Sequence, residues 1–164
     1  MDVKVTMEVG ELLFDIMDKT DLTGVSREAQ GLDFKAAAEM KASADERGYQ
    51  LRRSLNDAWT SARAELSEYV SDATTTADNL VRATIDSGGQ LVIGFGLPEN
   101  YNPASTDALA GSLHEYLVDK AMFAWYMLTN RPEAADYLQM AGAAMDRAKR
   151  AMYSRRRPVR PTYD

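Results

Sequence analysis

The sequence contains no cysteine and only one histidine, His114. The first absence excludes disulfide bonds and thiolate metal ligands, and the second leaves no pair of histidines to bind a metal. The longest unbroken apolar run is eight residues, Ala121–Leu128, whereas a membrane-spanning helix needs about 20. The N-terminus lacks the basic-then-apolar pattern of a secretion signal. We therefore expect a soluble protein that stays inside the cell that makes it, without a membrane partner.

The net charge of −6 is unevenly distributed over the 164 residues, a length that suits one domain with a real core. Residues 1–80 hold 16 acidic and 9 basic residues, and residues 81–145 hold 7 and 3. Residues 146–164 reverse the balance with 2 acidic and 7 basic residues. An acidic body with a basic tail indicates that the tail docks on something negative. That partner is either nucleic acid or the acidic body of a neighbouring copy.

Two helices are predicted within Thr106–Tyr153, separated by a sharp break at Asn130-Arg131-Pro132. Apolar residues recur at helical spacing in the first helix, and after Lys120 they cover every side. A helix that is apolar all round is buried all round, so this helix is either central or partly in contact with another chain. We expect the core to include Leu113, Leu117, Ala121, Ala124 and Leu128. The candidate interface with a neighbouring subunit is Phe123, Tyr126 and Met127.

The N-terminal half also has helical periodicity. Residues 1–6 alternate in polarity, as in a short strand or an extended start, and Thr6 is a plausible N-cap for a helix over 7–18. Residues 19–32 have few apolar anchors and are predicted to form a loop. A second stripe begins after Asp33 and continues to about Asp72. Gly48 costs about 1 kcal/mol in a helix interior, so we expect a break near 46–49.

A β-hairpin is predicted at 80–86 and 90–97. A three-residue loop, 87–89, would place Leu91, Ile93 and Phe95 opposite apolar residues and give one clean apolar face. Pro98 ends the second strand. The fold class is thus mainly α: a bundle of four to five helices with one inserted hairpin. Residues 1–153 form the single domain, and residues 154–164 form an extended basic tail because prolines interrupt it.

No motif in the chain carries a convincing catalytic signature. His114 precedes Glu115, but Val118 occupies the position where a zincin needs its second histidine. Gly88-Gly89-Gln90 matches the tripeptide that release factors use, yet a tight turn explains both glycines. Gly94-Phe95-Gly96 lacks the third glycine of a nucleotide fingerprint. We expect no catalytic residue, no cofactor and no metal, and therefore no enzyme.

The basic tail is the strongest local signal, with its arginines at Arg155, Arg156, Arg157 and Arg160. They could pair with carboxylates of a protein partner, bind phosphates of a nucleic acid, or only solubilise the chain. No base-reading module accompanies them, and the rest of the chain is acidic. Docking on a protein is therefore the favoured interpretation.

Three stretches in their order along the chain resemble a known family: Leu97-Pro98-Glu99-Asn100-Tyr101, Leu113-His114-Glu115-Tyr116-Leu117-Val118, and Arg155-Arg156-Arg157-Pro158-Val159-Arg160-Pro161. Together with the layout of a helical half, a hairpin and a helix pair, they resemble the small head–tail connector (adaptor) proteins of tailed bacteriophages and prophages, especially those of gut Bacteroidetes phages. The resemblance covers most of residues 8–161.

The resemblance implies a non-enzymatic virion protein that is assembled in the cytoplasm of the bacterial host. Such proteins form closed rings, usually of about twelve copies, under the portal and connect it to the tail, a stopper or the next ring. DNA passes nearby without sequence-specific binding. The basic tail would then grip an acidic partner such as the portal. The alternative is a helical nucleic-acid-associated protein that binds phosphates through its tail.

Overall fold

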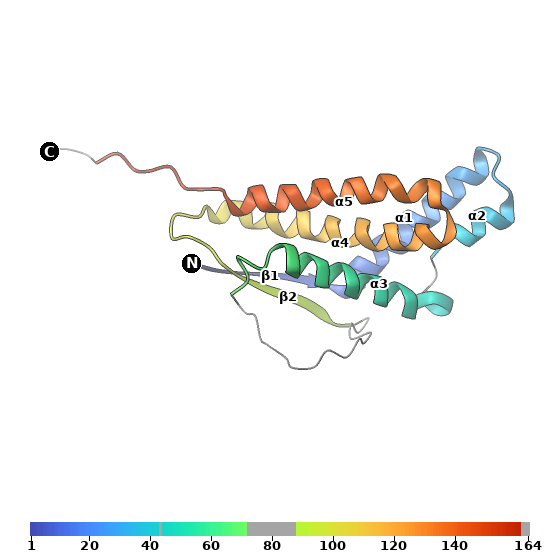
Figure 1. Cartoon of the computed structure of the whole chain (residues 1–164), viewed down its shortest axis with the longest axis horizontal. Helices are drawn as coiled ribbons and strands as arrows, with labels where there is room; N and C mark the ends of the chain where they lie inside the picture. Colours follow the sequence, from blue (N-terminus) through green and yellow to red (C-terminus); the bar gives the residue numbers. More distant parts are fainter. Residues whose placement is uncertain (43, 72–87, 162–164) are drawn as a thin grey trace.

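The computed structural model describes residues 1–42, 44–71 and 88–161 (Figure 1). It is mainly helical with one small antiparallel sheet, which confirms the predicted fold class. The elements are β1 (Asp2–Glu8), α1 (Val9–Ala29), α2 (Phe34–Met40), α3 (Ala44–Glu65), β2 (Gln90–Gly96), the 3-10 turn η1 (Pro103–Ser105), α4 (Thr106–Thr129) and α5 (Arg131–Met152). Within these residues no helix is long and apolar enough to cross a membrane.

The central element is α4, which is one of the two alternatives that its all-round apolar sequence left open. It lies between α5 on one side and α3 with the sheet on the other (Figure 1). The α5 face toward it carries the small buried residues Ala141, Ala144 and Ala148, which let the two helices approach closely. The predicted break is confirmed, because extended Asn130 separates the helices and Pro132 lies in the first turn of α5, where its missing N–H costs nothing.

The prediction that Leu128 lies in the core is wrong, because its side chain is 71% exposed. Burial in the last turns of α4 follows Val118, Met122 and Trp125 instead. A straight helix has 3.6 residues per turn, so a stripe drawn with a shorter repeat drifts off the buried face by about 20° per heptad. Ala124 is correspondingly only half-buried.

The sheet joins the two halves of the chain. β1 pairs antiparallel with β2, and Val3, Val5 and Met7 lie opposite Phe95, Ile93 and Leu91, all of them buried. The alternation that predicted a strand at 90–97 is thus confirmed for 90–96. Its predicted hairpin partner, 80–86, lies outside the described residues. On its other edge, Gly94 and Gly96 exchange backbone hydrogen bonds with Ser71 and Tyr69 at 2.9 and 2.8 Å.

The predicted loop at 19–32 is wrong, because α1 continues to Ala29. Thr20 is fully buried there, and its hydroxyl donates to the Met17 carbonyl at 3.0 Å and accepts from the Ala42 N–H at 3.1 Å. Gly24 is also buried, and a methyl group added to it would lie 3.0 Å from the Ala37 carbonyl oxygen. Thr20 and Gly24, two of the residues on which the predicted loop was based, are those that let α2 pack closely on α1. At its other end α1 begins after Glu8, and Thr6 belongs to β1 rather than capping the helix.

The helix break predicted near 46–49 lies earlier, because Lys41 is extended and ends α2, while Gly48 is inside α3. Two contacts fix this position: the Thr20 hydroxyl bonds Ala42, and the Trp125 indole donates to the Met40 carbonyl at 2.8 Å. The helix predicted to reach Asp72 ends at Glu65. Asp33 does occupy the N-cap position of α2, but its side chain makes no capping hydrogen bond.

Candidate functional site

The C-terminal arm, residues 154–161 of the described chain, is fixed at its root. The Asn102 N–H donates to the Ser154 carbonyl at 3.1 Å, and the Arg156 N–H donates to the Asn100 carbonyl at 2.8 Å. Between them Tyr101 and Arg155 form an antiparallel bridge, and the Tyr101 side chain is fully buried. The turn that precedes α4 therefore sets the direction in which the arm leaves the body.

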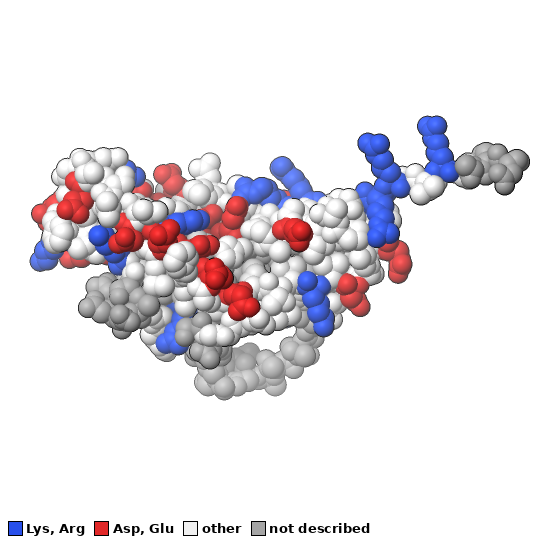
Figure 2. All heavy atoms as spheres, turned by 180° about the vertical axis from the view of Figure 1, so that it is seen from behind, with Lys and Arg blue, Asp and Glu red and all other residues white. Residues whose placement is uncertain are grey.

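Beyond its root the arm is exposed and extended. It runs away from the bundle at the C-terminal end of α5 (Figure 1), and Figure 2 shows its basic side chains projecting beyond a body on which acidic side chains are widespread. Pro158 and Pro161 restrict the backbone to extended conformations, and Val159 between them is 93% exposed. The arm is thus a stiffened basic segment that no described part of its own body covers.

The four predicted docking arginines have two different environments. Arg155 donates from Nη1 to the Met152 carbonyl at 2.8 Å, so it helps to close the C-terminus of α5. Arg156, Arg157 and Arg160 are exposed, and among the described residues they form no ion pair with the body. These three cations are therefore the part of the arm that is available to a partner.

The candidate interface residues are separated by the fold. Tyr126 is fully buried and stacks on Tyr137 with ring centroids 5.2 Å apart, and burial raises its pKa to about 12. The prediction that Tyr126 meets a neighbouring subunit is wrong, because α5 covers it within the same chain. Met127 is 40% exposed, and Phe123 is half-buried with the Lys120 ammonium over its ring.

The sequence did not reveal a second exposed apolar surface, which we call the α1 face. It consists of Phe14, Leu22 and Val25, which are exposed at helical spacing on α1. The sequence signal for it was present only in part, because Leu22 and Val25 fall in the segment that was predicted as a loop.

His114 lies in an acidic groove between the end of β1, the start of α1 and α4. The groove has a volume of about 420 Å³ and is lined by Thr6, Met7, Glu8, Glu11, Asp15, Ala110, Gly111 and His114. The His114 Nε2 atom lies 2.6 Å from Asp15 Oδ2, which joins α4 to α1. In the described part of the chain, no three histidine, aspartate or glutamate side chains converge as metal ligands do. The geometry of His114 is that of a polar contact between helices.

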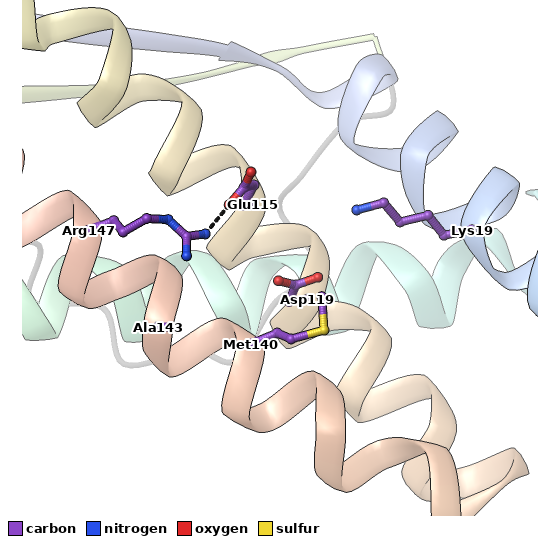
Figure 3. Close-up of a pocket in the computed structure, with 6 residues that line it drawn as sticks. All are labelled: Lys19, Glu115, Asp119, Met140, Ala143 and Arg147. Carbon is purple, nitrogen blue, oxygen red and sulfur yellow. Dashed lines mark hydrogen bonds and ion pairs between the residues drawn. The ribbon is translucent and has the colours of Figure 1, made fainter.

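A smaller pocket of about 200 Å³ lies among α1, α4 and α5 (Figure 3), and its lining residues are Lys19, Glu115, Asp119, Met140, Ala143 and Arg147. Arg147 forms an ion pair with Glu115 at one end. Asp119 is only 3% exposed, and its Oδ1 atom has no hydrogen-bond partner. Burial raises the pKa of this carboxyl, Lys19 and Arg147 oppose the rise, and Glu115 adds to it.

The sequence reasoning missed Asp119 as a site residue. The available signal was its position, because Asp119 lies three residues after Tyr116 and three before Met122, both of which are buried on α4. An acid in such a position is costly unless it is paired.

Comparison of the chain with family models, with curated proteins and with solved structures found no match.

Proposed function

We propose that the protein is a structural subunit of a tailed-bacteriophage or prophage particle, a ring-forming head–tail connector that joins the portal to the tail or to the next ring. The observation that carries the proposal is the C-terminal arm, anchored at Tyr101 and Arg155 and presenting Arg156, Arg157 and Arg160 away from its own body. The resemblance of the sequence to connector proteins gives this arm its expected role.

The charge distribution supports protein docking by the arm. Arginine forms bidentate, charge-assisted hydrogen bonds with carboxylates, and the face of the body seen in Figure 2 carries many carboxylates. Fixing the root and stiffening the segment with prolines reduces the entropy that the arm loses on binding. An acidic neighbour, whether a second copy or the portal, is the partner that this chemistry fits.

The arm also has the geometry that a ring requires. In a head-to-tail interface the two contacting surfaces differ, and successive copies close into a ring when the rotation between them allows it. A projecting basic arm and an acidic body are two such surfaces on one chain. The exposed Met127 and Leu128 and the α1 face offer apolar surface that a neighbour would cover, toward the roughly 1,000 Å² that a stable interface needs.

Mass measurement by light scattering and negative-stain imaging test the proposal on the full chain, alone and mixed with a candidate portal protein. We expect rings, either alone or on the portal. The triple variant Arg156→Gln, Arg157→Gln, Arg160→Gln should lose them. The matched control, Lys4→Gln, Lys35→Gln, Arg131→Gln, removes three exposed positive charges from the body and should keep them. A chain that stays monomeric and never joins the portal would overturn the proposal.

The second candidate function is binding of nucleic acid by the same arm, favoured by the exposure of three arginines along an extended backbone. It predicts that the logarithm of the association constant for duplex DNA falls with the logarithm of salt concentration, with a slope of about −2.7 for three phosphate contacts. The arm variant would abolish this binding, and the body control would weaken it only slightly. Rings without measurable DNA affinity would exclude this candidate.

A further inference from the structure

We infer that the pocket around Asp119 is the receptor for the C-terminal arm: it takes the guanidinium group of an arm arginine from a second copy of the chain. This inference rests on the proposed function, because it names the partner and the acceptor of the arm.

The pocket contains a buried acceptor without a donor. Asp119 lies on the buried side of α4 with 3% of its surface exposed, and its Oδ1 atom has no hydrogen-bond partner (Figure 3). Leaving a buried polar group unsatisfied is costly in free energy, and more so for a charged group. Buried polar groups in folded proteins are otherwise almost always paired, so the missing partner of Asp119 points to a ligand.

The lining of the pocket defines the chemistry of that ligand. A carboxylate only accepts hydrogen bonds, so the ligand must donate, and a guanidinium presents five donors in a planar fork. Glu115 is already occupied by Arg147, which leaves Asp119 as the free carboxylate. The Met140 thioether and the Ala143 methyl group supply apolar walls for the stem of an arginine.

The volume favours a side chain over a cofactor. The cavity measures about 200 Å³, whereas sites for small molecules and cofactors are typically about 300–1,000 Å³. Lys19 of α1 lines the same pocket but forms no ion pair with Asp119 (Figure 3).

The occupant comes from another copy because the arm leaves its own body. Its root is held by the turn at Asn100 and Asn102, and from there it runs away from the bundle (Figure 1). Arg156, Arg157 and Arg160 have no carboxylate partner among the described residues of their own chain. An arm with unpaired guanidinium groups and a pocket with an unpaired carboxylate complement each other in a head-to-tail contact.

Photo-crosslinking in the assembled full chain tests the inference. A benzoylphenylalanine in place of Val159, which is 93% exposed between two arm arginines, leaves every arginine intact. Rings assembled from equal amounts of ¹⁴N- and ¹⁵N-labelled chains distinguish crosslinks between copies from crosslinks within one. We expect mixed-isotope crosslinks to the α5 segment containing Met140 and Ala143.

Two pocket variants and two controls make the result specific. Asp119→Asn removes the acceptor charge and should lower the yield of this crosslink at least about tenfold, since a charge-assisted hydrogen bond contributes about 1.5–3 kcal/mol. Ala143→Leu fills the pocket from its exposed rim and should have the same effect even if Asp119→Asn fails to fold. Asp146→Asn and Ala135→Leu make the same chemical changes at exposed positions of α5 and should leave the yield within about twofold.

The outcomes separate this inference from the proposed function. Rings in which the arm crosslinks elsewhere, including the groove of Glu8, Glu11 and Asp15, overturn the pocket and leave the connector standing. The pocket inference is also overturned, and the connector left standing, if the pocket crosslink still forms in rings of Asp119→Asn and in rings of Ala143→Leu. A chain that forms no rings with or without the portal overturns the connector, and the pocket inference with it.

Discussion

The indole N–H of Trp125 donates a hydrogen bond of 2.8 Å to the carbonyl oxygen of Met40, 85 positions earlier in the chain. Met40 is the last residue of α2, so its carbonyl has no partner within the helix. The buried side chain of Trp125 therefore supplies the hydrogen-bond donor that the C-terminal end of α2 lacks. This contact ties the short α2 to the central α4.

Trp125→Phe should lower the free energy of unfolding by about 1–2 kcal/mol, because it keeps an aromatic ring but leaves the buried Met40 carbonyl without a donor. Urea denaturation followed by circular dichroism measures the change. Trp59→Phe is the control, since Trp59 is only half-buried on α3. An equal loss in the two variants would show that ring volume, and not the hydrogen bond, is responsible.

Thr20→Val should destabilise the protein by about 1–3 kcal/mol, because the buried Ala42 N–H loses its acceptor. Thr20→Ser retains the hydroxyl and should recover most of that loss. Thermal unfolding of both variants measures the difference, and the exposed Thr60→Val on α3 serves as a control for the chemical change. If Thr20→Ser is as unstable as Thr20→Val, the methyl group of Thr20 matters and its hydrogen bonds do not.

Gly24→Ala and Gly142→Ala should have opposite effects. A methyl group at Gly24 meets the Ala37 carbonyl at 3.0 Å, and forcing such contacts in a packed interior typically costs about 1–3 kcal/mol. A methyl group at Gly142 on α5 meets nothing within 4 Å, so the better helix propensity of alanine should stabilise by about 0.5–1 kcal/mol. Chemical denaturation of the two variants checks the signs, and stabilisation by Gly24→Ala would contradict the close packing of α1 on α2.

Asp119→Asn should stabilise the isolated protein at neutral pH. Burial raises the pKa of Asp119 above its ordinary value of 3.8, so the folded state disfavours the charged form. The resulting penalty is absent below pH 3.8, grows as the pH rises through the folded-state pKa, and is complete above it. We expect a gain in the free energy of unfolding of about 1 kcal/mol or more at pH 7.

That gain should shrink toward zero at pH 3.5, below the ordinary carboxyl value. Urea denaturation of both proteins at the two pH values measures it, with Asp146→Asn as the exposed control. A gain of equal size at both pH values would mean that ionisation of Asp119 is not its cause.

The parts of the fold that the sequence predicted are those whose pattern is local. Pro132 lies at the start of α5, so it marks the break between α4 and α5 directly. The apolar stripe of α4 lies within that helix, and the alternation of Leu91, Ile93 and Phe95 lies within β2. The end of α2 at Lys41 is different, because it depends on Thr20 and Trp125, which are distant in sequence. The low helix propensity of glycine had predicted the break at Gly48, but Gly48 lies inside α3.

The same distinction between local and long-range patterns applies to the candidate site. A cluster of arginines and prolines identifies an extended basic arm without knowledge of the fold. The burial of Tyr126 could not be predicted locally, because the ring that covers it belongs to Tyr137 on another helix, α5. The pocket around Asp119 could not be predicted either, because it forms only when α1, α4 and α5 pack together and place its carboxylate beside Met140 and Arg147.

The pairing of β1 with β2 has a consequence for synthesis of the chain. β1 begins at Asp2, but its partner begins at Gln90, and the central helix α4 comes only after that. During translation the apolar sides of β1, α1 and α3 therefore remain uncovered until the last third of the polypeptide has emerged. Such late, long-range closure makes folding slow and leaves intermediates prone to aggregation. Chains truncated before α4 should therefore aggregate more readily than the full chain, although the finished domain is small.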